Sequence, residues 1–320
     1  MKKSLYIICA IVLVAIKLSA QDEGIFNHYV INPVLVNPSF TGKDNKYQLF
    51  GHYRTQWTGF PNAAKTYALS YNGPLSDKVA LGGMILSEKY GLTDRLRGQM
   101  SYAYHFTNDK KGFKGGFGFS TEFHRTRLDP SVLTSNFFET GDRTVLGNVQ
   151  NVSIFDATAG FYGVFSDKLT LHLALPNLIR TRIGGQTPDS VKTEKTFLRQ
   201  FLLGASYRVK MGEKIVLEPS AQIRRVYQSP FEVELNMLAH FMNDRFTTGI
   251  SLRPGTSGAA SLLFGVKEKS FSIYYTYSAS MAEITSNRQG HEVTLGIELN
   301  RTKKEKIQAP TEKTKKKYRN

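Results

Sequence analysis

Cysteine is almost absent from this sequence, and its one cysteine lies near the N-terminus, in an apolar stretch of twelve residues, 5–16. Lys2 and Lys3 precede this stretch, and the small residues Ser19 and Ala20 follow it. This order is typical of a secretory signal peptide, and the stretch is shorter than the roughly 20 residues that a spanning helix needs. We expect residues 1–20 to be cleaved as a signal peptide. Because Cys9 would leave with it, disulfides, thiolate catalysis and cysteine-ligated zinc are excluded from the mature chain.

Long hydrophobic runs are also missing from the rest of the sequence. No other stretch approaches 18 consecutive apolar residues, so no transmembrane helix is expected. An exported protein of this kind is either released outside the inner membrane or inserted into the outer membrane as a β-barrel.

Acidic residues are fewer than basic ones, 26 against 42, which gives a formal charge of +16. The excess is uneven: residues 301–320 carry +7, the first 20 residues carry +3, and residues 21–300 carry only +6. The tail contains one aromatic residue, Tyr318, and an exported chain rarely meets nucleic acid, so no nucleic-acid partner is expected. We expect residues 301–320 to form a basic, flexible periplasmic tail; contact with peptidoglycan or with a periplasmic partner is the alternative.

The middle of the sequence alternates apolar and polar residues with the two-residue period of a β-strand. Between residues 96 and 106, for example, Met100, Tyr102 and Tyr104 share one face, and Gln99 and Ser101 share the other. This pattern predicts about fourteen strands, near residues 47–55, 65–72, 78–88, 94–106, 112–124, 151–165, 168–175, 197–209, 214–227, 231–240, 245–252, 258–267, 270–279 and 290–299.

The predicted connections alternate in kind. Every second one is a short polar turn such as Ser76-Asp77-Lys78 or Ser166-Asp167-Lys168, and the others include two long ones, residues 125–150 and 176–196. Outer-membrane barrels combine an even strand number with short periplasmic turns and longer outer loops. We therefore expect an all-β fold, a transmembrane antiparallel β-barrel over residues 47–300 with both chain termini in the periplasm. A soluble β-sandwich or propeller is the alternative, but it has no reason to sort its connections by length.

No catalytic or metal-binding pattern stands out. The seven histidines show no paired ligand spacing, and neither a Gly-x-Ser-x-Gly elbow nor a phosphate-binding loop occurs. We expect no enzymatic activity, no metal and no cofactor; an enzyme of this form would need a Ser/His pair on its outer wall, as in outer-membrane lipases.

Residues 21–46 form the most distinctive part that is not predicted to be strand. Asn32-Pro33 and Asn37-Pro38 alternate there with apolar side chains. A residue before proline is kept out of the helical region, so this is extended chain punctuated by turns. A segment so apolar must be buried, either as a plug inside the barrel or as a strap against a partner.

These residues also carry a resemblance to a known family. The pattern that begins at Tyr29 and ends at Gly42, followed by the block of residues 53–66 with the sole tryptophan, resembles the N-terminal part of the PorP/SprF family of Bacteroidetes outer-membrane proteins. Further matches are Asn72-Gly73-Pro74 and the last predicted strand. The resemblance covers roughly residues 21–299.

The resemblance implies an outer-membrane component of the type IX secretion system that supports secretion or surface attachment of large adhesins, as in gliding motility. Its implied partners are the secreted cargo, subunits of the machinery and outer-membrane lipid. A transport channel for small solutes or hydrophobic compounds is the alternative function. The candidate partner-binding residues are Tyr29, Asn32, Pro33, Asn37, Pro38, Arg54, Gln56, Trp57, Gly59, Phe60 and Pro61.

Removing residues 301–320 is predicted to leave the barrel folded, because the tail has the composition of a solvated appendage. The measurement is heat-modifiable migration in gel electrophoresis, which should match that of the full chain. Loss of the compact band would mean that the tail is needed for folding.

Overall fold

The computed structural model describes residues 26–134, 152–183, 200–225, 231–254, 258–281 and 289–301. The predicted signal peptide and the tail after Arg301 lie outside the described residues. Within these residues there are five short 3-10 turns, η1 (Asn27–Val30), η2 (Pro33–Leu35), η3 (Pro38–Phe40), η4 (Asp109–Lys111) and η5 (Pro130–Thr134). The strands are β1 (Lys46–Gln56), β2 (Ala64–Pro74), β3 (Val79–Tyr90), β4 (Thr93–Asn108), β5 (Phe113–Leu128), β6 (Val152–Phe165), β7 (Leu169–Leu175), β8 (Thr181–Ile183), β9 (Phe201–Tyr207), β10 (Val209–Met211), β11 (Ile215–Arg225), β12 (Glu232–Phe241), β13 (Phe246–Arg253), β14 (Ala259–Glu268), β15 (Phe271–Ser280) and β16 (Gly290–Asn300).

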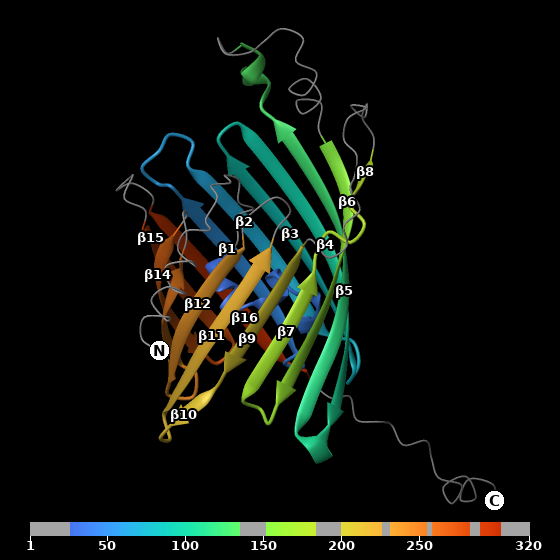
Figure 1. The fold of residues 1–320 in the computed structure, drawn as a ribbon, viewed down its shortest axis with the longest axis vertical. Helices are drawn as coiled ribbons and strands as arrows, with labels where there is room; N and C mark the ends of the chain where they lie inside the picture. The colour runs from blue at the N-terminus through green and yellow to red at the C-terminus, as the bar shows by residue number, and fades with distance from the viewer. Residues whose placement is uncertain are drawn as a thin grey trace, which may run out of the picture.

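Fourteen antiparallel strands form a closed barrel (Figure 1). The ring closes where β1 pairs with β16 from Lys46 opposite Asn300 to Gln56 opposite Gly290. Two further short strands are not among the fourteen strands of the ring. β8 pairs only with β6, and β10 follows β9 and pairs with the same strand, β11. The predicted barrel and its strand positions are thus confirmed; the predicted strand over residues 197–209 is divided into β9 and β10 at Arg208. Closure gives each of the fourteen ring strands a partner on both sides.

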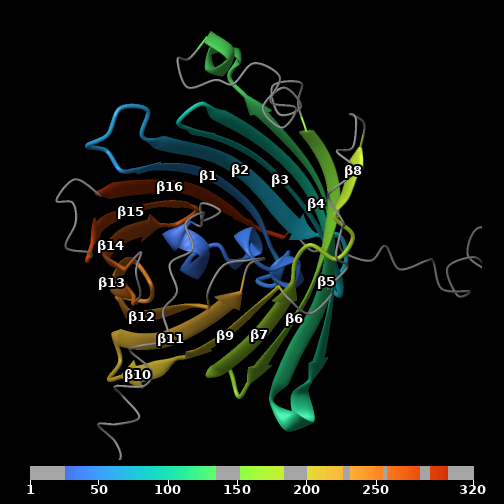
Figure 2. The same ribbon diagram turned by 45° about the horizontal axis from the view of Figure 1, so that its top comes forward.

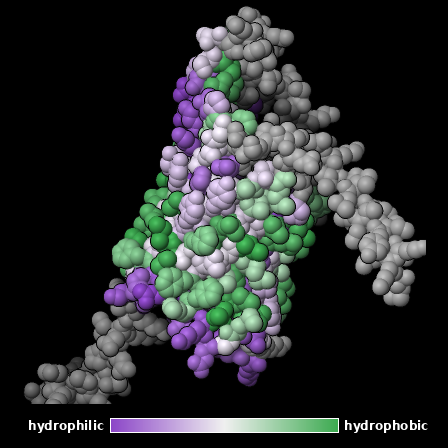
Figure 3. Space-filling view, turned by 90° about the vertical axis from the view of Figure 1, so that its left-hand side faces the viewer, coloured by the Kyte–Doolittle hydropathy of each residue, from purple (hydrophilic) through white to green (hydrophobic). Residues whose placement is uncertain are grey.

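The two faces of the wall differ as the alternation predicts. Along β4, Met100 and Tyr102 are exposed on the outer face, whereas Gln99 and Ser101 are buried on the inner face. Figure 3 shows hydrophobic side chains gathered on the outside of the wall and hydrophilic ones at its lower end. In an outer-membrane barrel, this outer surface faces the acyl chains of the bilayer. Among the described helical turns, none is long and apolar enough to cross a membrane.

The two ends of the barrel have different connections. At one end, here called the short-turn end, six short turns join consecutive strands of the ring. In the turn between β6 and β7, Ser166 and Asp167 both have positive φ, 51° and 55°, as tight hairpins require. At the opposite end, the long-loop end, most connections are longer, but Gly91 and Leu92 alone join β3 to β4.

The wall is not equally high all round. β4 and β5 have 16 residues each, whereas β7 and β9 have seven. At the long-loop end, β5 and β6 therefore extend well beyond β7, β9 and β11 (Figure 1). The wall is accordingly lowest on the side of these shorter strands.

We predict that Ile85→Arg destabilises the barrel by about 2–4 kcal/mol, because a charge in the middle of the outer wall would face the bilayer midplane. Ile85 is an exposed apolar residue halfway along β3. The measurement is equilibrium unfolding by denaturant in lipid vesicles.

Leu75→Arg is the control, because Leu75 is also exposed but lies in the short turn after β2. It should change the free energy of unfolding by no more than about 0.5 kcal/mol. Equal destabilisation by both substitutions would contradict a lipid-facing position for Ile85.

Candidate functional site: the N-terminal segment and the Trp57 loop

Residues 26–45, called here the N-terminal segment, lie inside the barrel. Figure 2 shows η1, η2 and η3 in the centre of the ring of strands. Each Asn-Pro pair begins a 3-10 turn, with Pro33 and Pro38 at the first position of their turns; Asn37, directly before the second turn, has an extended backbone. The sequence therefore folds this stretch into three compact turns that fit within the lumen. This is the position that the plug alternative describes.

The start of the N-terminal segment is fixed by a buried carboxylate. Glu292 on β16 is almost completely buried and accepts hydrogen bonds from the backbone N–H groups of Asn27, at 2.8 Å, and His28, at 2.9 Å. The Arg54 side chain lies 3.9 Å from the same carboxylate, on the facing residue of β1. Two orphan donors of η1 and one guanidinium thus converge on one acid, which ties the segment to the β1–β16 pair.

His28 is held between two strands. Its ring nitrogens lie 2.6 Å from the Thr294 hydroxyl and 2.8 Å from the Thr276 hydroxyl. Burial, with a smaller effect of the nearby Arg54 cation, lowers the pKa of His28 to about 3. The imidazole is therefore neutral at neutral pH, when one ring nitrogen donates and the other accepts.

The two asparagines of the Asn-Pro pairs hold the middle of the segment. The Asn37 side-chain oxygen accepts from the Ser39 backbone N–H, at 3.0 Å, and from its hydroxyl, at 2.7 Å. Its amide nitrogen donates to the carbonyl oxygens of Phe161, at 3.3 Å, and Leu173, at 3.1 Å. Asn32 donates to the Ser70 hydroxyl at 3.0 Å. Asn37 thereby satisfies both ends of its amide while fully buried.

Two glycines make room for the Asn37–Ser39 turn. Gly118 of β5 and Gly160 of β6 face each other in the strand register. A Cβ atom at Gly160 would lie 2.0 Å from the Asn37 side-chain oxygen, and one at Gly118 would lie 2.5 Å from the backbone of Pro38 and Ser39. These glycines therefore allow the segment to reach the wall, a close approach that any larger residue would block. They form what we call the glycine seat.

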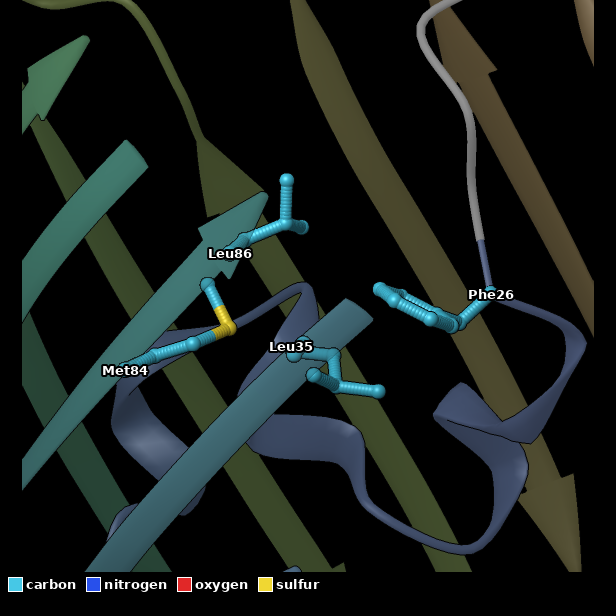
Figure 4. Close-up of a cluster of buried hydrophobic side chains, with 5 residues drawn as sticks. Phe26, Leu35, Met84 and Leu86 are labelled. Carbon is cyan, nitrogen blue, oxygen red and sulfur yellow. The ribbon is translucent and has the colours of Figure 1, made fainter. Parts of the chain in front are cut away.

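Apolar contacts complete the docking of the segment at three places on the inner wall. Figure 4 shows Phe26 and Leu35 beside Met84 and Leu86 of β3. The other two contacts are Val34 and Phe40 against Tyr162 and Val164, and Val30 and Ile31 against Leu238, Leu263 and Tyr274.

Ion pairs surround the lumen toward the long-loop end. Arg97 lies 2.7 Å from Glu122, and other such pairs join neighbouring strands around the ring. Lys114, near the start of β5, pairs with Asp167 at the exposed rim of the short-turn end, at 2.7 Å. The further pairs toward the long-loop end are Arg95–Glu88, Arg224–Glu232, Arg253–Glu234 and Arg54–Glu292.

The structure divides the predicted site residues into two groups. Trp57, Gly59, Phe60 and Pro61 are exposed in residues 57–63, the Trp57 loop, at the long-loop end. A cavity of about 140 Å³ next to this loop is lined by Arg54, Gln56 and Trp57, and also by Asn27 of the segment. The loop and the segment therefore meet through β1. The remaining predicted residues, all in the segment within the lumen, are Tyr29, Asn32, Pro33, Asn37 and Pro38.

Sequence reasoning missed the residues of the wall that receive the segment. Glu292 of the wall and its neighbour His28 of the segment gave no signal of their contact, since each is one polar residue in an ordinary pattern. The glycine at position 118 lies in a cluster whose mid-strand position indicates strand curvature. A glycine within a strand can also mark a place where another backbone approaches closely. This second interpretation fits Gly118, which lies against the backbone of Pro38 and Ser39.

The fold and its filled lumen define the class of protein: a closed membrane β-barrel of outer-membrane type. Among solved structures, the chain is similar to a deletion mutant of the TodX monoaromatic hydrocarbon channel, with a TM-score of 0.52, 12% identity, and coverage of 87% of this chain and 95% of that one. It is also similar to the toluene transporter TbuX of Ralstonia pickettii, with a TM-score of 0.50, 10% identity, and coverage of 84% and 93%. At these identities the likeness concerns the fold alone.

A family model for the type IX secretion system membrane protein PorP/SprF matches residues 18–297. The chain therefore belongs to the PorP/SprF family. No curated protein sequence matches it. The family is a class of secretion-system membrane barrels and not a class of enzymes, and membership implies contact with the secretion machinery and its cargo in general terms.

We predict that Gly160→Ala loosens the N-terminal segment, because the added methyl group would collide with Asn37. Such overpacking costs about 1–3 kcal/mol, so a cysteine placed at the buried Ser39, in a chain without Cys9, should react with a maleimide about tenfold faster. The measurement is the labelling rate in the folded barrel.

Gly98→Ala is the matched control, because Gly98 lies in mid-strand on β4 and a Cβ atom there meets no atom within 4 Å. It should leave the labelling rate unchanged. Equal rates in the Gly160→Ala variant and the original chain would show that the glycine seat does not position the segment.

Proposed function

We propose that this protein is an outer-membrane component of the type IX secretion system that supports the secretion or surface attachment of large adhesins by binding other proteins. The observation that carries this proposal is the filled lumen. The N-terminal segment is joined to the wall by hydrogen bonds and apolar contacts from many strands. A barrel filled in this way is better suited to present a rigid binding surface than to conduct solutes.

The Trp57 loop is the proposed contact surface for the partner. Trp57 and Phe60 are 46% and 45% exposed, so two large aromatic side chains lie on the surface of the same short loop. Trp57 has a positive φ of 57°, a conformation that a bulky residue adopts at a cost of about 1–2 kcal/mol. Exposed aromatic residues are frequent anchors in protein interfaces.

The proposal also includes the orientation of the barrel in the outer membrane. Short turns face the periplasm in outer-membrane barrels, which puts the Trp57 loop on the cell surface. The last described residue, Arg301, pairs with Asp77 in the turn after β2, at 2.7 Å. The basic tail would then start on the periplasmic side, next to the machinery and peptidoglycan.

The double substitution Trp57→Ala with Phe60→Ala is predicted to reduce surface display of adhesin strongly. Loss of an aromatic anchor typically weakens an interface by about 2 kcal/mol or more, equivalent to roughly thirtyfold in affinity. The measurements are adhesin labelling on intact cells and co-purification of the partner after crosslinking.

Phe271→Ala provides the control, because Phe271 is another highly exposed aromatic residue but begins β15 at the short-turn end. Both variants should keep their heat-modifiable migration. A deletion strain with normal adhesin display, together with sustained conductance of the purified barrel in planar bilayers, would favour the transport channel instead.

A further inference from the structure

A groove of about 550 Å³, called here the outer groove, crosses the outside of the barrel from β1 to β6. β2, β3 and β4, which form its middle, are neighbours in the ring (Figure 1). Gly83 and Gly98 line it without a side chain, and a Cβ atom at Gly98 would meet no other atom within 4 Å. Most of the remaining lining is apolar and exposed, including Leu69, Tyr71, Ile85, Met100 and Phe123.

The outer groove faces the bilayer. On β4, Gly98 and Met100 alternate with the buried Gln99 and Ser101, so they point away from the lumen and toward the acyl chains of the membrane. An empty groove in this surface would leave its lining without van der Waals partners on one side. A flexible acyl chain can adapt its shape and supply those partners. The outer groove therefore favours the hydrocarbon part of a lipid.

Two lysines lie on the same outer face, closer to the long-loop end. Lys65 of β2 and Lys89 of β3 are directly opposite each other in the strand register. Each lysine is four residues from a residue of the outer groove on its own strand, Leu69 or Ile85, which is about 13 Å of extended chain. Like charges in directly opposite positions repel each other. An anionic group between the two lysines would relieve this repulsion.

A second cavity, of about 420 Å³, lies at these lysines and is called here the lysine cavity. Lys65 and Lys89 line it together with Thr55 at the end of β1 and with Thr58 and Asn62 of the Trp57 loop. Hydroxyl and amide groups donate hydrogen bonds to anionic oxygens, and a lysine ammonium is a common binding group for phosphate. The lysine cavity therefore has the chemistry of a site for a phosphate group.

The charge around the lysine cavity is positive. Lys89 lies 3.9 Å from the half-exposed carboxylate of Asp94, whereas Lys65 has no carboxylate partner among the described residues. Within the described part of these strands, cations outnumber carboxylates on the outer face at the long-loop end. The cations are Lys65, Lys89, Arg125 and Arg127, and the carboxylates are Asp94 and, directly after β5, Asp129.

We propose that the outer face of β2, β3 and β4 binds a lipid of the outer leaflet that has a phosphorylated head group. The phosphate lies between Lys65 and Lys89 in the lysine cavity, and an acyl chain follows the wall into the outer groove at Gly98. This inference rests on the orientation given under the proposed function, which puts the lysines in the leaflet at the cell surface. It adds a lipid ligand directly beside the Trp57 loop.

The test is native mass spectrometry of the purified full mature barrel in a neutral detergent. The four probes are phosphorylated lipid A, lipid A after removal of its phosphates, phosphatidylcholine and inorganic phosphate. Phosphorylated lipid A is expected to bind saturably with one molecule per barrel, and each other probe at least about tenfold more weakly. Because binding in detergent depends neither on membrane orientation nor on adhesin, this result is independent of the test of the proposed function.

A double substitution locates the head group. Lys65→Gln with Lys89→Gln should weaken phosphorylated lipid A about thirtyfold, the effect expected for two basic residues at a lipid head group. Lys78→Gln with Lys110→Gln is the matched control, because it removes the same charge from exposed lysines at the short-turn end. The control should bind the lipid as the original chain does.

A second substitution locates the acyl chain. Gly98→Phe fills the outer groove and should weaken phosphorylated lipid A at least about tenfold. Ala260→Phe, on the outer face of β14, adds the same ring outside the outer groove and should have no effect. All variants should keep their heat-modifiable migration.

Several results would overturn the proposal. They are absence of a retained lipid, equal binding of lipid A with and without phosphate, binding of inorganic phosphate as tight as that of the lipid, and equal effects of a site variant and its control. A dimer of the barrel that Gly98→Phe dissociates would also overturn it, since a second copy would then occupy the outer groove.

Discussion

The polar inner wall of the barrel is the constraint on which the rest of the structure depends. Its buried side chains are cut off from bulk water and need partners inside the lumen, because an unpaired buried polar group is costly. The N-terminal segment supplies many of these partners. Glu292 receives two backbone N–H groups of η1, and Asn37 donates to carbonyl oxygens of β6 and β7. The segment is therefore part of the barrel's interior and not an appendage to it.

This interior also connects the start of the N-terminal segment with the Trp57 loop at the long-loop end. Arg54, three residues before Trp57, faces Glu292 across the β1–β16 pair, and Glu292 holds Asn27 and His28. The start of the segment, the Trp57 loop and the strand pair that closes the barrel thus share one cluster of charges. A protein that binds partners benefits from such support, because a rigid surface loses less conformational entropy on binding.

Most of the fold was predictable from the sequence for a simple reason. A lipid-facing wall imposes apolar residues at every second position, and short hairpins need polar residues that tolerate positive φ, such as Ser166 and Asp167. Both signals are local. The glycine seat, the pairing of Arg54 with Glu292 and the exposed position of Lys114 at the rim depend on residues far apart in the chain, so local patterns could not reveal them.

The sequence by itself determined the strand periodicity, the alternation of turns and loops, and the family. Only the tertiary structure decided where the Asn-Pro segment lies and what surrounds it. The physical reason is that period-two alternation states which face of a strand is polar, but not which groups satisfy that face. Closure of the ring brings Gly118, Gly160, Glu292 and the segment together, and those contacts hold the segment inside the lumen.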